Sequence, residues 1–428
     1  MKEKELREIP KEEQPYELPE GWKWVQGISV FKPMESTSPS NKTFRYIDID
    51  SIDNEKREVR QSKTMETEHA PSRAKRKLHM GDTIFSLVRP YLNNIAYIDD
   101  GLSDCIASTG FFVCTPKGDI DSKYTYWMMV NPEVVAGLTT LMKGDNSPSI
   151  RAKDIYSYLF PLPPIDEQRR IVACIERLFA HLDAAEQKVR QVREASTRRQ
   201  QSLLHQAFHG ELTKKWREAH GTTPLKEIPD IPQEEQPYKL PKGWQWGRMS
   251  DVVSEEKEKT DNFLDYNYYV GLEDMDKDGG VIHYSNVGKI KSMKSIFHKG
   301  QILYGKLRPY LNKHGVAESE GICSTDIIVL GTKKNSVPYF VNYYLGVPEF
   351  ISYAVNHSKG TNLPRLSPKV FMKIHFPIPP LAEQHEIVRC LDGLMTHERR
   401  IASACDTALR QIEALRTTIL ARAFRGKH

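Results

Sequence analysis

A long internal repeat is the feature that most constrains what this chain can fold into. The segment IPKEEQPYELPEGWKW, which begins at residue 9, returns at residue 231 as IPQEEQPYKLPKGWQW with twelve of sixteen positions identical. Three shorter matches follow in the same order: MGDTIFSLVRPYLNN with KGQILYGKLRPYLNK, FPLPPIDEQ with FPIPPLAEQ, and AFHG with AFRG. Solenoid units run only about 20–50 residues, so a repeat of this length predicts a pseudo-dimer within one polypeptide.

Each copy divides into a globular part and a helix. Short apolar or β-branched runs such as RYIDIDSI, GDTIFSLV and GFFVCTP alternate with Gly, Pro, Asn and Asp, which indicates strands and turns. A few helical stretches interrupt them, so we expect a mixed α/β fold. After Pro163 and Pro164 the first copy runs to Gly210 without Pro or Gly, which predicts one long helix.

The long helices carry apolar side chains at alternating steps of four and three, the pattern of a coiled-coil seam. In the first copy these include Ile171, Ile175, Leu178, Leu182, Val189 and Val192, and in the second Ile387, Leu391, Leu394, Ile401, Ile412 and Leu415. At about 1.5 Å per residue, such a helix would be roughly 63 Å long and would need a partner to cover its apolar stripe. We therefore expect the two helices to pair antiparallel and to separate the two globular parts.

Polar residues interrupt this predicted seam. Ser196 and Arg199 interrupt the first helix, and Glu398 interrupts the second. If the helix ends are flush, Arg199 comes near Asp392 and within a heptad of Glu398, which would fix the register of the pair. The alternative is that Arg199 extends off the seam into solvent.

Composition excludes several classes of protein. With 39% hydrophobic and 27% charged residues and no apolar run of about 18 residues, the chain is neither disordered nor membrane-spanning. Six Cys without a CxxC pair, and a start without an apolar leader, predict a cytoplasmic location. The 61 basic and 56 acidic residues give a net charge of only +5, which does not by itself indicate a nucleic acid partner.

Catalytic and metal-binding motifs are not evident. The segment GQILYGKL resembles a phosphate-binding loop, but it ends in Leu307 where Ser or Thr would bind magnesium, so it predicts a turn and a strand. The His residues lack metal-ligand spacing, and the equivalent Cys174 and Cys390 are expected to be small buried side chains. We predict no metal site, and a chain that binds rather than catalyses.

Basic residues in both globular parts are candidates for DNA contact. They are Arg73, Lys75, Arg76 and Lys77 in the first copy, and Lys289, Lys291 and Lys294 in the second. Each copy then carries Arg-Pro-Tyr-Leu-Asn, which contributes Arg89 and Arg308. Lys and Arg bind phosphates, and Arg and Asn can read base edges. The alternative is a solvated face followed by a structural turn.

Residues that read different sequences should differ between the copies. The copies diverge after Gly144 and Gly360, where Asp-Asn-Ser faces Thr-Asn-Leu. We expect base contacts in these loops, from Asn146, Ser147, Asn362 and Arg365.

The doubled pattern resembles a known family. A Leu-Pro-x-Gly-Trp start, a Gly-Asp-x-Ile strand, a glycine turn, Pro-Leu-Pro-Pro-x-x-Glu-Gln, a long helix and Ala-Phe-x-Gly are similar to the DNA specificity subunit of type I restriction–modification systems. The departures are small: Ala382 stands where the first copy has Asp166, and Gln301 where it has Asp82. The resemblance implies that each globular part is a target-recognition domain for one half of a bipartite, asymmetric DNA site.

The resemblance also implies the division of the chain and its partners. We expect target-recognition domains at 1–160 and 235–376, conserved helices at 161–210 and 377–428, and a connector at 211–234. The expected partners are double-stranded DNA, two methyltransferase subunits and motor-nuclease subunits, which would use S-adenosylmethionine, ATP and magnesium; no cofactor is expected in this chain. The alternatives are a scaffold whose globular parts bind protein, and an enzyme whose motif is not recognised.

Overall fold

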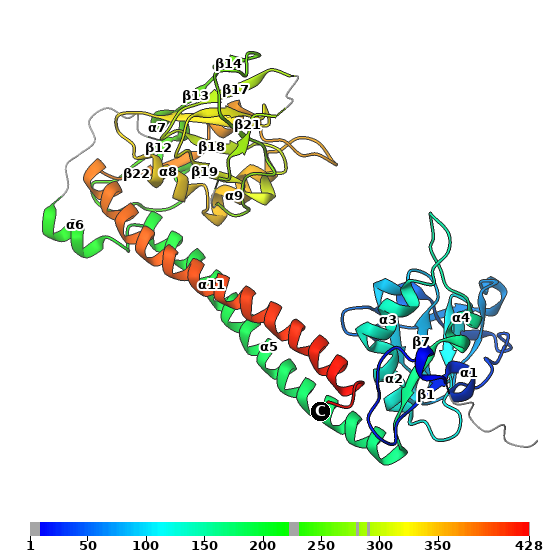
Figure 1. Ribbon diagram of the computed structural model, residues 1–428. Coiled ribbons are helices and arrows are strands. Elements are labelled where there is room, and N and C mark those ends of the chain that lie inside the picture. Colours follow the sequence, from blue (N-terminus) through cyan, green and yellow to red (C-terminus); the bar gives the residue numbers. More distant parts are fainter. Residues whose placement is uncertain (1–8, 222–230, 280–281, 289–291, 428) are drawn as a thin grey trace, which may run out of the picture. The chain divides into compact units, whose positions relative to one another are not determined.

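The computed structural model describes residues 9–221, 231–279, 282–288 and 292–427. The chain forms two compact units. The first comprises residues 1–189 and 407–428, and the second comprises residues 190–406. The boundary between them falls within both long helices, so each unit contains a globular part and a stretch of each helix (Figure 1). The five-part division predicted from the sequence stays a prediction.

Two main sheets form the first unit. One has the order β5, β2, β9, β6 and consists of β5 (Lys63–Glu66), β2 (Thr43–Ile47), β9 (Ile106–Ser108) and β6 (Ala74–Lys77). β2 runs parallel to β9, and the other neighbours are antiparallel. The second sheet is antiparallel and consists of β10 (Phe111–Cys114), β7 (Thr83–Ser86) and β8 (Ile95–Tyr97). The pairs β1 (Lys23–Gln26) with β11 (Leu159–Leu162) and β3 (Ile52–Asp53) with β4 (Glu58–Val59) are separate.

The second unit repeats this topology with one added strand at an edge of each sheet, β14 in the larger and β13 in the smaller. Its larger sheet has the order β14 (Lys259–Thr260), β17 (Lys294–Phe297), β20 (Gly321–Cys323), β15 (Tyr268–Val270) and β16 (Ser285–Asn286). β15 is again parallel to its neighbour β20. The other sheet is β13 (Val253–Glu256), β21 (Ile327–Thr332), β18 (Ile302–Gly305) and β19 (His314–Val316), and β12 (Gln245–Arg248) pairs with β22 (His375–Ile378). The predicted mixed α/β fold is confirmed in both copies.

Short helices cover one face of the smaller sheet in each unit. They are α1 (Gly27–Val30), α2 (Ser122–Val130), α3 (Pro132–Thr139) and α4 (Ala152–Ser157) in the first unit, and α7 (Met249–Val252), α8 (Pro338–Tyr344), α9 (Pro348–Asn356) and α10 (Pro368–Phe371) in the second. Both faces of β7 are buried. Phe85 joins the core under the helices and Ile84 the core between the sheets. Such a strand reads as a continuous apolar run.

The predicted long helices are confirmed as α5 (Ile165–Phe208) and α11 (Leu381–Ala423). In each unit they lie side by side and antiparallel (Figure 1). In the first unit Arg416 pairs with Glu186 at 2.8 Å, while Leu420 shares a core with Ile175. In the second unit α5 and α11 are joined by ion pairs of 2.6 and 2.7 Å, Arg193 to Asp406 and Arg199 to Glu398.

Three predicted seam residues lie at the surface, so that part of the prediction is wrong. Val192, Leu394 and Leu415 are 48%, 41% and 49% exposed. A straight α-helix has 3.6 residues per turn, so a strict 3.5-residue grid drifts across its face. In α11 the step after Leu391 is four residues and buries Met395 instead of Leu394.

The remaining predicted seam residues lie inside or at the edge of the packed surface. Ile171, Ile175, Ile387, Leu391 and Ile412 are buried, and Leu178, Leu182, Val189 and Ile401 are half-buried. The prediction that the two equivalent cysteines are buried is only partly correct. Cys174 and Cys390 are half-buried, and both are free thiols.

The repeated sequence motifs connect the elements of each unit. Gln168 is buried at the start of α5; its side chain accepts a hydrogen bond from the amide of Asp121 and donates to the carbonyls of Asp119 and Pro163. Gln384 makes the same set of bonds at the start of α11. The Gln of the repeated Glu-Gln therefore fixes the start of a long helix to its globular part.

The Ala-Phe-x-Gly ends of the helices are also built into the cores. In the first unit Tyr16 donates a hydrogen bond from its hydroxyl to the carbonyl of Phe424, which is buried. In the second unit Tyr238 donates in the same way to Phe208. Each globular part is thus completed by the end of the helix from the other copy of the repeat. After α5, the connector forms α6 (Lys214–His220), whose Arg217 pairs with the buried Glu383 of α11.

Candidate nucleic-acid interface

The predicted basic run of the first copy lies on β6, an edge strand of the larger sheet. Arg73, Lys75 and Lys77 are exposed, whereas Arg76 is half-buried and its Nε has no hydrogen-bond partner. Lys75 donates to Ser38 Oγ at 3.3 Å. The side chains alternate as they do on any strand, so exposed cations occupy one face of this edge.

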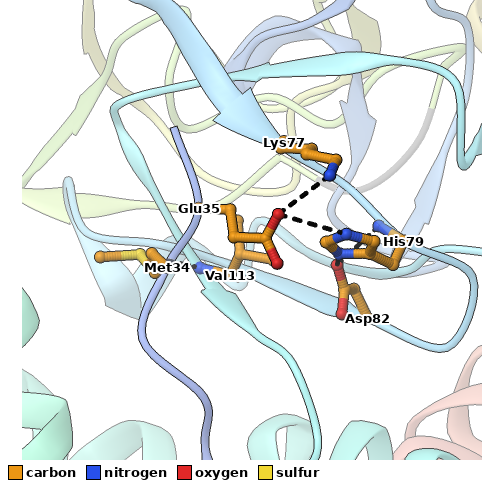
Figure 2. A network of polar contacts seen from close by, with 6 residues as sticks. All are labelled: Met34, Glu35, Lys77, His79, Asp82 and Val113. Atoms are coloured by element: carbon orange, nitrogen blue, oxygen red, sulfur yellow. Dashed lines mark hydrogen bonds and ion pairs between the residues drawn. The ribbon is translucent and has the colours of Figure 1, made fainter. Parts of the chain in front are cut away.

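An acidic network neutralises part of this edge (Figure 2). Glu35 Oε2 lies 3.0 Å from Lys77 Nζ and 3.6 Å from His79 Nε2, and Asp82 Oδ2 lies 3.4 Å from His79 Nδ1. Hydrogen bonding to Lys77 lowers the pKa of Glu35, and burial raises the pKa of Asp82. Lys77 therefore already has a carboxylate partner in the free chain.

The equivalent strand of the second unit is β17, which lies between β14 and β20 and so is not an edge strand. Lys294 opens this strand, is half-buried, and donates to Ser292 Oγ at 2.6 Å. Its ammonium lies 6.0 Å from the centre of the Tyr269 ring. Lys289 and Lys291 lie outside the described residues.

The two Arg-Pro-Tyr-Leu-Asn segments form the same turn. Pro90–Leu92 and Pro309–Leu311 are single 3-10 turns, each flanked by residues in the left-handed region. Arg89 has φ 47° and Arg308 has φ 52°. Left-handed backbone costs a residue with a Cβ of the order of 1 kcal/mol, and such strain collects at functional sites. Both arginine side chains are exposed.

A second loop packs beside this turn in each unit. Residues 143–149 form a tight hairpin closed by hydrogen bonds between Lys143 and Ser149, and residues 359–365 repeat it between Lys359 and Arg365. Gly144 at φ 98° and Gly360 at φ 107° make the turns possible. The predicted base readers Asn146, Ser147, Asn362 and Arg365 are all exposed here.

Hydrogen bonds join turn and hairpin. The backbone amide of Arg89 donates to Pro148 at 2.9 Å, and its guanidinium donates to the carbonyl of Asn146 at 3.0 Å. The amide of Arg308 donates to Pro364 at 2.7 Å. We call residues 89–93 with 143–149, and residues 308–312 with 359–365, the loop pair of each unit.

The structure therefore brings together some of the predicted residues and not others. Arg89 lies with Asn146 and Ser147, and Arg308 lies with Asn362 and Arg365. The basic runs belong to a different sheet, and no hydrogen bond or ion pair joins them to the loop pairs in the part of the chain that is described. Whether each residue contacts DNA stays a prediction.

Sequence reasoning missed four exposed side chains of the loop pairs. Tyr91 and Tyr310, at the tips of the turns, are 45% and 52% exposed, and Lys143 and Lys359 open the hairpins. A signal for them existed, because both hairpins read Lys-Gly-x-Asn-x-Pro.

Clusters of metal-binding side chains are absent among residues 9–221, 231–279, 282–288 and 292–427. No group of three or more His, Cys, Asp or Glu side chains there could hold a metal ion. Gly300 forms a turn with φ 87° that leads into β18, as predicted from the sequence instead of a phosphate-binding loop. Within the same residues, no helix is long and apolar enough to cross a bilayer.

Comparison with known proteins gives consistent matches over both copies. The family model of the type I restriction modification DNA specificity domain matches residues 31–194 and 241–403. The specificity subunit of the type I restriction enzyme EcoDI from Escherichia coli is 30% identical over 326 residues, which covers 72% of this chain and 70% of that protein. The EcoKI specificity subunit of E. coli K12 is 24% identical over 318 residues, 68% of this chain and 62% of that protein.

Solved structures show the same likeness. A chain from a study of complex assembly and conformational transition of the type I R-M system is similar with a TM-score of 0.76 and 26% identity, covering 97% of this chain and all of that chain. The HsdS subunit of Thermoanaerobacter tengcongensis is similar with a TM-score of 0.56 and 26% identity, covering 97% and 99% of the two chains.

Proposed function

Because this chain belongs to the family of type I restriction–modification DNA specificity subunits, we propose that each unit reads one half of a bipartite, asymmetric DNA site. The observation that carries this proposal is that one topology occurs twice, with one loop pair in each copy. In the hairpins of the loop pairs, residues that the two copies share alternate with residues that differ. A DNA site with two different half-sites requires two readers with one architecture and different contact residues.

The proposal assigns the chemistry to partners. A specificity subunit binds DNA and the other subunits of its complex, and it is not itself the catalyst. We propose that two methyltransferase subunits supply adenine methylation with S-adenosylmethionine, and that motor-nuclease subunits supply ATP- and magnesium-dependent cleavage. The cytoplasmic location predicted from the sequence belongs to the same proposal.

The long helices suit a spacer and a docking surface. α5 has 44 residues and would measure about 66 Å at 1.5 Å per residue, close to two turns of DNA at about 34 Å each. Val192, Leu394 and Leu415 leave apolar side chains exposed on these helices. We propose that the methyltransferase subunits dock on the helices, and that helix length sets the distance between half-sites.

A domain exchange tests the proposal. Residues 25–160 are replaced by the corresponding segment of another specificity subunit, and methylated adenines are mapped in a genome that expresses the hybrid with the methyltransferase of the unaltered system. We expect one half of the recognised site to change and the other half to stay. A change in both halves, or in neither, would contradict the modular reading.

Two other outcomes would favour the alternatives. A protein scaffold predicts no sequence-selective DNA binding by the complex. An unrecognised enzyme predicts that the purified chain alone cuts or modifies DNA.

A further inference from the structure

The loop pairs expose side chains that are identical in both units although the two half-sites are expected to differ. Among the identical residues are Arg89 with Arg308, Tyr91 with Tyr310, and Lys143 with Lys359. Part of the identity between the two loop pairs serves the fold, and part of it does not. The two kinds of identity can be separated by burial and backbone geometry.

Some of the identical residues are needed to build the loops. Pro90 and Pro309 are buried, and Asn93 and Asn312 adopt the left-handed backbone that Asn tolerates. Likewise the hairpin prolines accept hydrogen bonds from the arginine amides. These identities follow from the turn geometry and need no ligand.

The exposed side chains are different. Tyr310 is 52% exposed, and Arg308 and Lys359 are exposed. Neither cation has an acidic partner among the described residues, and the same holds for Arg89 and Lys143 in the first unit. Only the guanidinium of Arg89 has a hydrogen bond, to the carbonyl of Asn146. The fold does not explain why these side chains are the same in both copies.

Two exposed cations at positions that differ between the copies are paired instead. Arg365, which faces Ser149 in the repeat, lies 3.2 Å from Asp326. Lys77 lies 3.0 Å from Glu35. The shared cations of the loop pairs, by contrast, are available for an external anion, and each unit has an exposed tyrosine in the same loop pair.

We propose that each loop pair binds the phosphate backbone of its half-site through Arg89, Tyr91 and Lys143 or through Arg308, Tyr310 and Lys359, without reading bases. This inference rests on the proposed function. Two different half-sites share their phosphates and not their bases, so side chains that are identical in both units fit what the half-sites have in common. Arg, Lys and Tyr are among the residues that supply phosphate contacts in protein–DNA complexes.

Reading of bases then falls to the positions where the loop pairs differ. Within the hairpins these are Asp145 against Thr361, Ser147 against Leu363, and Ser149 against Arg365. Asn146 and Asn362, which are identical, belong with the shared set. Each loop pair thus combines phosphate-binding residues that both units share with hairpin positions that differ between the units.

The test uses the full chain in complex with its methyltransferase subunits. Arg308→Gln with Lys359→Gln removes two shared cations from the second unit. Arg248→Gln is the control, since it removes an exposed cation of the same unit that lies outside the loop pair on β12 and is paired with Glu235 at 3.5 Å. Affinity is measured for the cognate duplex and for an unrelated duplex across a salt series. Methylated sites are mapped for each variant.

We expect the double variant to bind both duplexes more weakly by the same factor, about tenfold or more at low salt. The slope of log affinity against log salt should fall by nearly 2, since each phosphate contact contributes about 0.9. The recognised sequence should not change. Arg308→Lys should keep the slope of the wild type, and Arg248→Gln should leave it unaltered.

Other outcomes overturn the inference. Loss of affinity for the cognate duplex alone, or relaxed methylation at one half-site, would make these residues base readers. A complex that no longer assembles in the absence of DNA, measured by sedimentation, would make the loop pair a docking site for protein. A structural role would be shown if the double variant had a lower melting temperature and Arg308→Lys lost DNA affinity by the same factor. If the wild-type complex itself lacks sequence selectivity, the proposed function fails and not only this inference.

Discussion

At the scale of single residues, His314 shows how the two units differ inside one topology. It is 3% exposed on β19, with Nδ1 2.8 Å from Asn342 Oδ1 and Nε2 3.3 Å from Asn312 Nδ2. A neutral ring can donate at Nδ1 and accept at Nε2. Burial lowers the pKa of His314 to about 4. The equivalent residue of the first unit is Ile95, which cannot titrate.

We predict that the second unit loses stability in mild acid. The unfolded chain binds a proton on this histidine near pH 6.5, whereas the folded chain binds it only near pH 4. The free energy of unfolding should therefore fall as the pH drops from about 6.5 to about 4, by up to roughly 3 kcal/mol. Hydrogen exchange of β19 at pH 7 and pH 5, corrected for intrinsic rates, measures this loss.

Two comparisons make this prediction specific. Strand β8, which contains Ile95, should keep its protection over the same pH range. His314→Gln should abolish the extra acid sensitivity of β19, whatever its effect at pH 7. Equal sensitivity of β19 in the wild type and the variant would show that another group is responsible.

At the scale of elements, the three polar residues that interrupt the seam form one cluster. Glu398, 6% exposed, accepts hydrogen bonds from Arg199 at 2.7 and 3.0 Å and from Ser196 Oγ at 2.6 Å. Hydrogen bonding to Arg199 lowers the pKa of Glu398. The predicted approach of Arg199 to Glu398 is confirmed, while Asp392 instead accepts a bond from Tyr343 at 2.6 Å.

We predict that Arg199→Leu destabilises the helix pair within the second unit. It leaves the Glu398 carboxylate in a poorly solvated place without its countercharge, which costs more than the pair contributes. Amide exchange around residues 395–402 of α11 should become several-fold faster. The double variant Arg199→Leu with Glu398→Leu should recover much of the protection.

Arg198→Leu is the matched control, because the one ion pair of Arg198 among the described residues is with Glu194 on its own helix, at 3.8 Å. It should leave the exchange of α11 unchanged. If Arg199→Leu also leaves the amide exchange of α11 unchanged, the cluster does not stabilise the helix pair. If the double variant stays as labile as the single one, loss of packing explains the effect better than an unpaired charge.

The elements also show which parts of the fold the sequence could reveal. The long helices, the strand before each Arg-Pro-Tyr turn and the mixed α/β character follow from periodicity, because a 44-residue run without Gly or Pro has few alternatives. The sheet orders could not be predicted, since they depend on pairings between distant strands such as β2 with β9. The seam prediction was wrong at Leu394, because a step of four residues after Leu391 places Met395, and not Leu394, in the buried stripe.

The candidate interface was only partly predictable for a related reason. Arg89 and Asn146 are 57 residues apart, and only the fold joins them. The identity of Lys143 with Lys359 was readable in the repeat, but their exposure and lack of acidic partners were not. Conversely, Lys77 belonged to a conspicuous basic run, yet the structure gives it Glu35 as a partner.

At the scale of the whole molecule, the proposed spacing role makes helix length the quantity to vary. A heptad inserted after residue 190 of α5 and another after residue 406 of α11 would lengthen both helices by about 10.5 Å at 1.5 Å per residue. The two positions are close to each other in the antiparallel pair, because Arg193 and Asp406 form an ion pair of 2.6 Å. Matched insertions should therefore preserve the apolar stripe on both sides.

We predict that the double insertion changes the spacer of the recognised site and neither half-site. An extension of about 10.5 Å corresponds to about three base pairs at 3.4 Å each. Mapping methylated adenines in a genome that expresses the variant with its methyltransferase measures both properties at once. An insertion in α5 alone is the control; it puts the two helices out of step and should reduce methylation without a new spacing. An unchanged spacer in an active double variant would mean that helix length does not set the distance between the half-sites.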